Sequence, residues 1–429
     1  MTGTALRATL APGALARRYA DIRAHTATLV APLSAEDCAL QSMPDASPAK
    51  WHLAHTTWFF ETFVLDPHVP GYRIFDPTYR ALFNSYYEAV GERHPRHERG
   101  MLSRPDLATI FAYRTHVDRA MAACLELAHV DAALAALIEL GLNHEQQHQE
   151  LILTDILHLL SRNPQRPACA ADAPRTRALQ VGGLQWLRVP AGITRIGHDG
   201  PGFAFDNETP AHRVFLEAFE IASRPVTNGE YAAFVDDGGY RRPECWLALG
   251  WDTLRARQWS APLYWERRDG RWQGFTLRGL AELDMNAPVE HLSYFEADAY
   301  ARWAQARLPT EFEWEAAVRQ ASRSDAARAH AATAGASDVG NADVRGALSI
   351  GEVWEWTSSS YAPYPRFRPA GGAVGEYNGK FMCNQYVLRG GSMATPAGHS
   401  RVTYRNFFAP DARWQFSGVR LARDVDQQA

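Results

Sequence analysis

The first 165 residues carry apolar positions at the three-to-four-residue spacing of amphipathic helices. One helix start is marked by Ser47 as the N-cap and Pro48 in the first turn, and its end is marked by Asp66 and Pro67. Four helices joined in one segment predict a four-helix bundle. The expected helices cover residues 14–33, 47–65, 105–128 and 130–160.

The connection between the second and third expected helices is long and rich in aromatic residues. It contains the run FNSYYEAVGERHPRHERG at positions 83–100. Connections of this length inside a compact domain are usually functional or disordered, and the aromatic residues argue against disorder. We therefore expect this segment to contribute to a functional site.

The pattern changes near residue 165, where a polar, proline-rich stretch begins. We expect residues 166–176 to form a linker. Beyond it, short apolar runs, glycines and tryptophans replace the long helical periodicity, and we expect only two helices, at 294–304 and 311–319. An Ala- and Ser-rich segment at 320–345 is expected to be a mobile loop. The sequence thus predicts a helical domain over 1–165 and a second domain over 177–429.

Composition narrows the class of protein. The chain has 429 residues, 46% hydrophobic and 21% charged, with a formal net charge of -4. This balance argues against a nucleic-acid-binding protein that relies on bulk electrostatics, and no segment approaches the ~18 apolar residues of a membrane span. The five cysteines are scattered without a Cys-x-x-Cys pair. They fit a reducing cytoplasm and leave histidine as the residue that would bind a metal.

Two histidines lie one turn apart on the fourth expected helix. His144 and His148 share one face of that helix, and this spacing is typical of metal ligands. The alternative is a polar face in contact with solvent. Leu151 and Asp155 continue the same stripe, so we expect both histidines to face inward.

A third histidine, His55, lies along the inward stripe of the second helix, whereas His52 lies about 60° away. The alternative for His55 is a core histidine bonded to a carbonyl group. Three inward imidazoles without a carboxylate would leave open coordination positions, which suits zinc hydrolysis or iron(II) with oxygen. We expect Glu145 and Glu150 to face solvent, and His158 to be structural or exposed.

Several segments resemble one enzyme family. SPAKWHLAHTTWFFETFVL, the run at 83–100 and HEQQHQE are similar to the DinB-like bundle of the ergothioneine-biosynthetic sulfoxide synthases. PVTNGEYAAFV, RLPTEFEWEAA, GEVWEWTSS and VLRGGS are similar to their C-terminal domain. The resemblance covers about residues 15–425. It implies a DinB-like four-helix bundle followed by an α+β domain of the formylglycine-generating-enzyme, C-type-lectin-like fold.

The resemblance also implies roles for single residues. The family's iron ligands correspond to His55, His144 and His148, and Fe(2+) is the implied cofactor. Gln147 matches a contact to the imidazole of the substrate, and Arg96 matches an anchor for the carboxylate of the sulfur donor. The remaining implied residues are Tyr86 and Tyr87 for proton donation, without a choice between them, and Asn406 and Phe407 near the trimethylammonium group of the substrate.

The implied reaction joins a thiol to carbon 2 of the imidazole of hercynine, with oxygen consumed and a sulfoxide formed. After Arg405 and Asn406 the chain lacks the acidic residue typical of branches that use γ-glutamylcysteine, so the resemblance favours cysteine as the donor. Met393 stands where close relatives have a cysteine. A selenoneine synthase, which couples a selenosugar to hercynine, is the closest alternative and stays open.

Alternatives from other classes also stay open. A zinc-dependent thiol transferase on a DinB-like bundle would leave the second domain unexplained. A non-catalytic binding module would leave the three histidines and the two loop tyrosines unexplained. The expected partners are small molecules, namely hercynine, a thiol or selenosugar, and O2, without nucleic acid or membrane; the sequence does not define an oligomeric state.

Overall fold

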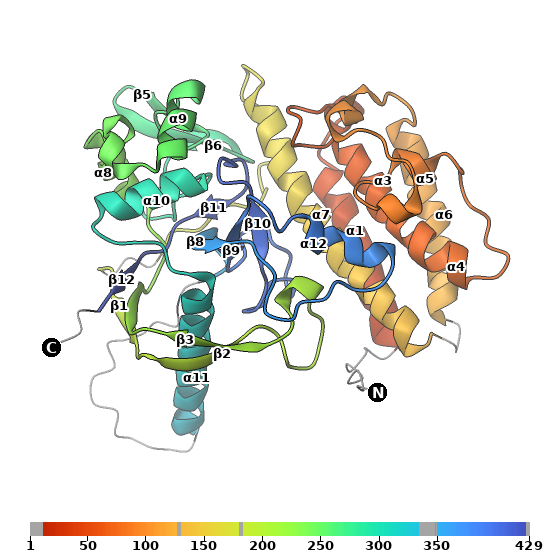
Figure 1. Cartoon of the computed structure of the whole chain (residues 1–429). Coiled ribbons are helices and arrows are strands. Elements are labelled where there is room, and N and C mark those ends of the chain that lie inside the picture. The colour runs from red at the N-terminus through yellow and green to blue at the C-terminus, as the bar shows by residue number, and fades with distance from the viewer. Residues whose placement is uncertain (1–11, 127–129, 180–182, 334–347, 349, 426–429) are drawn as a thin grey trace.

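The computed structural model describes residues 12–126, 130–179, 183–333, 348 and 350–425. Figure 1 shows a helical bundle beside a part that contains several small sheets, with helix α7 running between them. The predicted fold class, a bundle followed by an α+β domain, is confirmed. The domain boundaries expected from the sequence stay a prediction.

The four long helices of the bundle are those expected from the sequence, and residues 127 and 128 of the third lie outside the described residues. Short helices fill the connections between them. The long helices are α1 (Pro12–Val30), α3 (Ala49–Phe60), α6 (Leu107–Glu126) and α7 (Ala132–Ser161). The short ones are α2 (Ala35–Ala39), η1 (Glu61–Leu65), α4 (Asp66–His68), α5 (Tyr79–Leu82), η2 (Glu88–Val90) and η3 (Arg96–Met101).

The start of α3 differs from the expected capping. Pro48, rather than Ser47, is the N-cap residue, and no side chain caps this end. Ser47 instead donates its backbone N–H to Asp155 on α7 at 2.8 Å, and its hydroxyl accepts a hydrogen bond from Arg99 at 2.9 Å. Polar contacts to other segments, rather than local capping, therefore hold this end of α3.

Helices α3 and α7 approach each other closely at Gly141. A Cβ atom at this position would lie 2.7 Å from ring atoms of both Phe59 and Phe60. A glycine is therefore needed here, one turn before His144, for the two histidine-bearing helices to pack at this distance.

Glu145 is fully buried, so the expectation that it faces solvent is wrong. It accepts hydrogen bonds from Arg23 at 2.9 Å, Arg114 at 3.1 Å and Thr26 at 2.6 Å. The two guanidinium groups lower the pKa of this carboxyl to about 2 against the effect of burial. The carboxylate thus ties α7 to α1 and α6, because a buried charge is stable only when it is paired.

The second part is built from small sheets with helices packed around them (Figure 1). The sheet orders are β1-β4-β12, β10-β9-β8-β11, β2-β3 and β5-β6-β7. The strands are β1 (Trp186–Val189), β2 (Gly192–Ile196), β3 (His212–Leu216), β4 (Phe219–Ala222), β5 (Trp265–Arg268), β6 (Arg271–Thr276), β7 (Gly279–Glu282), β8 (Trp354–Ser360), β9 (Tyr386–Arg389), β10 (Asn406–Phe408), β11 (Ser417–Gly418) and β12 (Ala422–Asp424).

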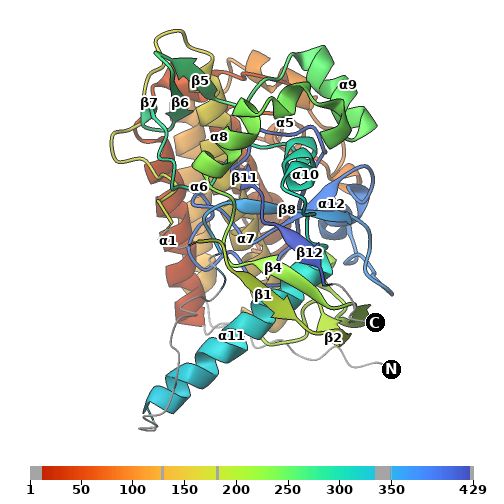
Figure 2. The same ribbon diagram turned by 90° about the vertical axis from the view of Figure 1, so that its left-hand side faces the viewer.

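The helices of this part include two that the sequence predicts, α10 (Tyr294–Trp303) and α11 (Glu311–Thr333). Helix α11 continues to Thr333. The expectation of a mobile loop at 320–345 is therefore wrong for residues 320–333. Figure 2 shows α11 projecting from the second part. Residues 334–345 lie outside the described residues. The expectation of only two helices in this part is wrong, because three more are present: α8 (Asn228–Asp236), α9 (Ala248–Arg257) and α12 (Glu376–Lys380). Short turns lie at η4 (Asp206–Glu208), η5 (Gly239–Arg241), η6 (Pro243–Cys245) and η7 (Ala373–Gly375).

One apolar core crosses the junction between the two parts. Phe275, Leu277, Ala394 and Phe416 of the second part are buried in the same cluster as the core of the bundle. Burial of apolar surface therefore holds the two parts together and fixes the position of α7 between them. Within the described ranges, no helix combines the length and the apolar character that crossing a membrane requires.

Candidate active site

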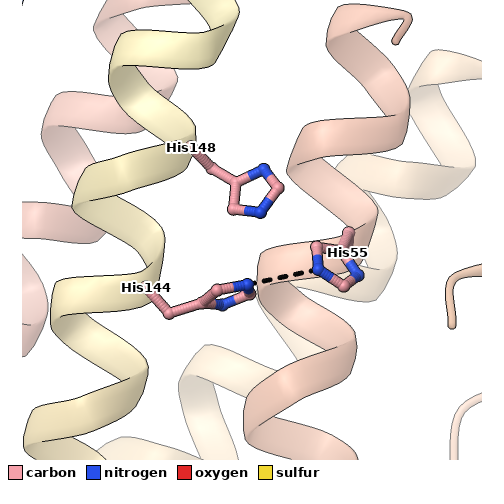
Figure 3. Close-up of side chains that lie close together, drawn as sticks. All are labelled: His55, His144 and His148. Atoms are coloured by element: carbon pink, nitrogen blue, oxygen red, sulfur yellow. Dashed lines mark hydrogen bonds between the residues drawn. The ribbon is translucent and has the colours of Figure 1, made fainter. Parts of the chain in front are cut away.

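Three histidines from α3 and α7 converge inside the bundle. His55, His144 and His148 are 2%, 6% and 9% exposed. One ring nitrogen from each lies within 4.8 Å of the other two, and the Nε2 atoms of His55 and His144 are 3.2 Å apart. Figure 3 shows the three rings directed toward one point between the helices. The inward orientation expected from the helical stripe is therefore what the structure contains.

Burial keeps these imidazoles neutral. Loss of solvation lowers the pKa of His144 to about 4 and holds the pKa values of His55 and His148 well below their usual range. The Nδ1–H of His55 donates to the Phe83 carbonyl at 2.6 Å, so its Nε2 carries a lone pair. Neutral imidazoles with a free lone pair are the form that binds metal ions.

The spacing of the cluster fits a metal ion. Two nitrogen atoms at ~2.1 Å from one ion, at angles of about 90–109°, are roughly 3.0–3.4 Å apart. The 3.2 Å between the Nε2 atoms of His55 and His144 falls in this range. Among the described residues no carboxylate joins the cluster, so a bound ion would keep open positions. This donor set suits both zinc and iron(II).

A cavity of ≈ 210 Å³ lies against the cluster, between the bundle and the second part. The structure brings every site residue expected from the sequence to its wall, from α3, α7, the connection at 83–100 and β10. These residues are His55, His144, His148, Gln147, Tyr86, Tyr87, Arg96, Asn406 and Phe407.

The two loop tyrosines differ in their surroundings. The hydroxyl of Tyr86 accepts a hydrogen bond from Arg96 at 2.9 Å, and its ring packs on Phe381 with a centroid distance of 4.9 Å. Tyr87 is 4% exposed and packs against Trp58, one of the two indoles that stack on His55. Burial raises the pKa of Tyr87, so this phenol keeps its proton at neutral pH.

Two arginines of this loop face the cavity without a carboxylate partner among the described side chains. Arg96 is held by Tyr86 and by the Asp45 carbonyl. Arg99 is 3% exposed, lies 3.4 Å over the Trp51 ring and donates to the hydroxyls of Ser47 and Ser85. Burial lowers the pKa of Arg99 to about 9. The pair makes this wall of the cavity favourable for an anion.

Helix α7 is tied to the second part on both sides of His148. Gln147 donates to the Tyr404 hydroxyl at 2.7 Å. Glu150 accepts hydrogen bonds from Trp354, Ser392 and Thr395 at 2.6–2.8 Å. The expectation that Glu150 faces solvent is therefore wrong: its carboxylate joins the two parts at the edge of the cavity, and removal from water raises its pKa.

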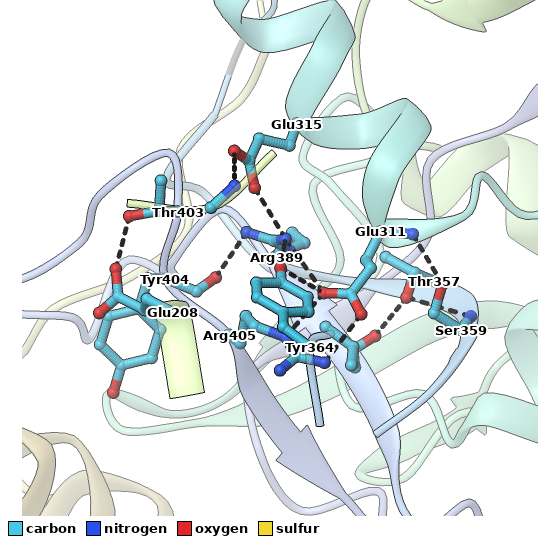
Figure 4. A network of polar contacts seen from close by, with 12 residues as sticks. Glu208, Glu311, Glu315, Thr357, Ser359, Tyr364, Arg389, Thr403, Tyr404 and Arg405 are labelled. Carbon is cyan, nitrogen blue, oxygen red and sulfur yellow. Dashed lines mark hydrogen bonds and ion pairs between the residues drawn. The ribbon is translucent and has the colours of Figure 1, made fainter. Parts of the chain in front are cut away.

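A buried ion-pair network holds the segment that carries Tyr404 and Asn406 (Figure 4). Arg405 donates to both carboxylate oxygens of Glu311 at 2.8 and 2.9 Å. Arg389 joins Glu311 to Glu315 and also donates to the Tyr404 carbonyl at 3.2 Å. Since bidentate pairs restrict orientation as well as distance, this network fixes the position of the wall segment that carries Tyr404 and Asn406.

Another part of the cavity wall is aromatic. Phe407 stacks on Tyr361 with ring centroids 4.1 Å apart and lies 5.6 Å from Phe381 and 6.5 Å from Tyr377. Tyr377 and Phe381 come from α12 and the residue after it, and both line the cavity. Several ring faces around one space are the arrangement that binds a quaternary ammonium group.

The sequence did not identify several cavity residues. Arg99 follows Arg96 at a spacing of three, which was a usable signal for a shared face. Tyr377, Phe381 and His399 had none, because they are aromatic residues in a segment without regular periodicity. The residues missed by sequence reasoning are Arg99, Tyr377, Phe381, His399 and Tyr404.

Comparison with known proteins agrees with the two-part structure. The Sulfatase-modifying factor enzyme 1-like domain matches residues 174–345 and 347–425, and the DinB superfamily matches residues 18–152. The chain is 35% identical to the hercynine oxygenase of Mycolicibacterium thermoresistibile, over 96% of this chain and 95% of that protein. It is 35% identical to the hercynine oxygenase of Mycobacterium tuberculosis, over 96% and 99%. Identity to the formylglycine-generating enzyme of Streptomyces coelicolor is 30%, over 61% of this chain and 95% of that enzyme.

The fold and the site define a class of enzyme in which a DinB-type bundle with three converging histidines is joined to a formylglycine-generating-enzyme-like domain. Within this class, the chain belongs to the hercynine oxygenase family. The family resemblance found in the sequence is thereby confirmed.

Proposed function

We propose that the protein is a non-haem iron(II)- and oxygen-dependent enzyme that couples hercynine to cysteine and forms the sulfoxide. The observation that carries the proposal is the cluster of three neutral imidazoles beside a cavity lined by both parts of the chain. Membership of the hercynine oxygenase family supports the same substrate and the use of oxygen. The five free cysteines fit a reducing cytoplasm as its location.

Hercynine carries an imidazole, a carboxylate and a trimethylammonium group. Gln147 lies directly before His148, and its amide is held by Tyr404, so it can present a polar group to the substrate imidazole beside the metal ligands. The ring faces of Phe407, Phe381 and Tyr377 can surround the trimethylammonium group through cation–π contacts, each worth about 0.5–2 kcal/mol. Asn406, which directly precedes Phe407, also lines the cavity.

The arginine wall supports a thiol donor that carries a carboxylate. Arg96 and Arg99 line the cavity without carboxylate partners in the described structure, and cysteine would supply the missing anion. Iron(II), when bound, supplies oxygen activation and a coordination position for the donor sulfur. The residues around it hold both substrates at one centre, which makes their coupling effectively intramolecular.

Tyr86 and Tyr87 are the candidates for proton donation. Tyr86 is oriented by Arg96, and Tyr87 keeps its proton because burial raises its pKa. Either phenol would deliver a proton to reduced oxygen from the wall of the cavity.

The alternatives have less support. Met393, the residue that left a selenium donor open, is partly buried against the core of the bundle and is absent from the residues that line the cavity. A zinc-dependent thiol transferase would use the same histidines but would leave the aromatic wall of the second part without a role.

Metal-dependent oxygen uptake tests the proposal. Metal-free full-length protein is loaded anaerobically with Fe(2+) or with Zn(2+) and then mixed with oxygen, hercynine and cysteine. We expect oxygen uptake that requires iron and both substrates. Turnover with zinc and no oxygen uptake would support the transferase and contradict the proposal.

A further inference from the structure

His52 is a fourth buried histidine at the centre, and the site described above gives it no role. It lies on α3 and is 2% exposed. Its Nδ1 is 2.8 Å from Nδ1 of His148, and its Nε2 is 3.1 Å from Oδ2 of Asp155. Asp155 is 6% exposed, and the same oxygen accepts the backbone N–H of Ser47 at 2.8 Å. The four groups form a chain from the backbone of Ser47 to a metal ligand.

We propose that His52, supported by Asp155, is a positioning residue that fixes the tautomer and the ring orientation of His148. A carboxylate only accepts hydrogen bonds, so the proton between His52 and Asp155 is on Nε2 of His52. A neutral imidazole carries one ring proton, so Nδ1 of His52 is then an acceptor. The 2.8 Å contact therefore runs from the Nδ1–H of His148 to His52, and Nε2 of His148 is left with its lone pair.

The reverse assignment does not suit a metal ligand. If His52 donated from Nδ1 to His148, its bare Nε2 would face the Asp155 carboxylate, placing two acceptors 3.1 Å apart. The ring proton of His148 would also move to Nε2, the nitrogen that remains for the metal. A doubly protonated His52 would likewise donate from Nδ1 to His148 and leave the ring proton of His148 on Nε2.

His55 and His148 thus have matching arrangements, whereas His144 does not. Both use Nδ1–H as a donor to the protein, His55 to the Phe83 carbonyl and His148 to His52. The Nδ1 of His144 is buried without a hydrogen-bond partner among the described residues. Groups that accept a hydrogen bond from a metal-bound histidine usually contribute 10–100-fold to metal affinity. Here the acceptor is the imidazole of His52, which is itself held by the Asp155 carboxylate.

The test is Co(2+) affinity of the metal-free full-length protein, measured by competition with a chromophoric chelator. His52→Phe keeps the ring volume but removes the acceptor, and we expect it to weaken binding about 10–100-fold. His52→Asn places an amide oxygen close to the former Nδ1 position, so we expect it to recover most of this loss. His158→Gln is the matched control on α7, since His158 contacts Ser42 outside the centre, and its affinity should equal that of the unmodified protein.

Equal affinity of His52→Phe and the unmodified protein, or equal losses in His52→Phe and His52→Asn, would overturn the inference. Circular dichroism of the metal-free variants establishes folding. Asp155→Asn provides a second variant should His52→Phe fail to fold, with a smaller loss expected in the same direction and an unchanged affinity contradicting the relay. The inference rests on the proposed metal centre, and different results contradict the two claims. If the unsubstituted protein binds no Co(2+), the metal centre itself is contradicted, whereas unchanged affinity in the variants contradicts only the role of His52.

Discussion

Gln147 donates a hydrogen bond to the hydroxyl of Tyr404 at 2.7 Å, across the junction between the bundle and the second part. Gln147 directly precedes His148 on α7, and Tyr404 belongs to the segment anchored by Arg389. The residue next to a candidate metal ligand is therefore oriented by the other part of the chain. The cavity is complete only when the two parts are packed together.

Loss of this contact should weaken substrate binding without affecting the metal. Tyr404→Phe removes the hydroxyl that holds the Gln147 amide, and a hydrogen bond of about 1 kcal/mol corresponds to roughly 5-fold in affinity. We expect the KM for hercynine to rise about 5-fold, with the affinity for Fe(2+) unchanged, as measured by steady-state oxygen uptake and metal titration. An unchanged KM would show that Gln147 does not contact the substrate.

The three-histidine centre predicts that no ligand is dispensable. His148→Ala leaves two imidazoles, which do not hold iron(II) tightly enough to survive gel filtration. We expect less than stoichiometric iron after anaerobic loading and desalting, by elemental analysis. A folded His148→Ala protein with full iron content and normal turnover would remove His148 from the centre.

The proton-donor role predicts a loss of turnover with iron retained. The phenylalanine variant of whichever tyrosine donates, Tyr86 or Tyr87, should slow product formation by about 10²–10⁴-fold, the usual contribution of general acid catalysis. Single-turnover rates and iron content measured on both variants separate this role from metal binding. Normal rates in both variants would assign the proton to another group.

Arg96 should affect the sulfur donor selectively. Arg96→Gln removes a charged hydrogen-bond donor worth about 1.5–3 kcal/mol, so we expect the KM for cysteine to rise roughly 10–150-fold while the KM for hercynine changes little. Arg93→Gln is the matched control in the same loop, because Arg93 is 47% exposed and paired with Glu88. Equal effects of the two substitutions would contradict an anion site at Arg96.

We expect the buried His399 to lower the free energy of unfolding at acidic pH. Its side chain is 1% exposed, and burial, together with nearby Arg401, lowers its pKa to about 3. In the unfolded chain the pKa of this histidine is about 6.5. Below that pH the unfolded chain binds a proton that the folded protein does not, so the free energy of unfolding falls as the pH decreases. We expect His399→Gln to remove about 1.4 kcal/mol per pH unit of this dependence between about pH 5.5 and 4. Urea unfolding at several pH values measures both slopes, and identical slopes would contradict a neutral buried His399.

The sequence predicted the bundle and its histidines because helical spacing is a local property. His144 and His148 lie one turn apart on any α-helix, and the glycine at 141 allows α3 to approach. The distinction between His52 and His55 was less secure than the stripe suggested, since every residue of α3 is buried. Only tertiary contacts separate the residue that joins the cluster from the one that contacts Asp155.

The failures have a common physical cause. Glu145 and Glu150 were expected in solvent because carboxylates are usually exposed, and their partners lie far away in the sequence, at Arg23 and Ser392 among others. The aromatic wall at Tyr377 depends on how α12 packs against the loop at 83–100, which no local pattern encodes. Segments without periodicity therefore contributed the cavity residues that the sequence did not reveal.

Product analysis tests the central claim most directly. Iron-loaded protein is supplied with oxygen, hercynine and an equal mixture of cysteine, γ-glutamylcysteine and a selenosugar, and the products are identified by mass spectrometry. The account predicts the sulfoxide of hercynine joined to cysteine through sulfur, formed only with iron and oxygen. A selenium-containing product would show that the donor is a selenosugar rather than cysteine. If neither a carbon–sulfur nor a carbon–selenium product forms with any metal, the proposed coupling is contradicted altogether.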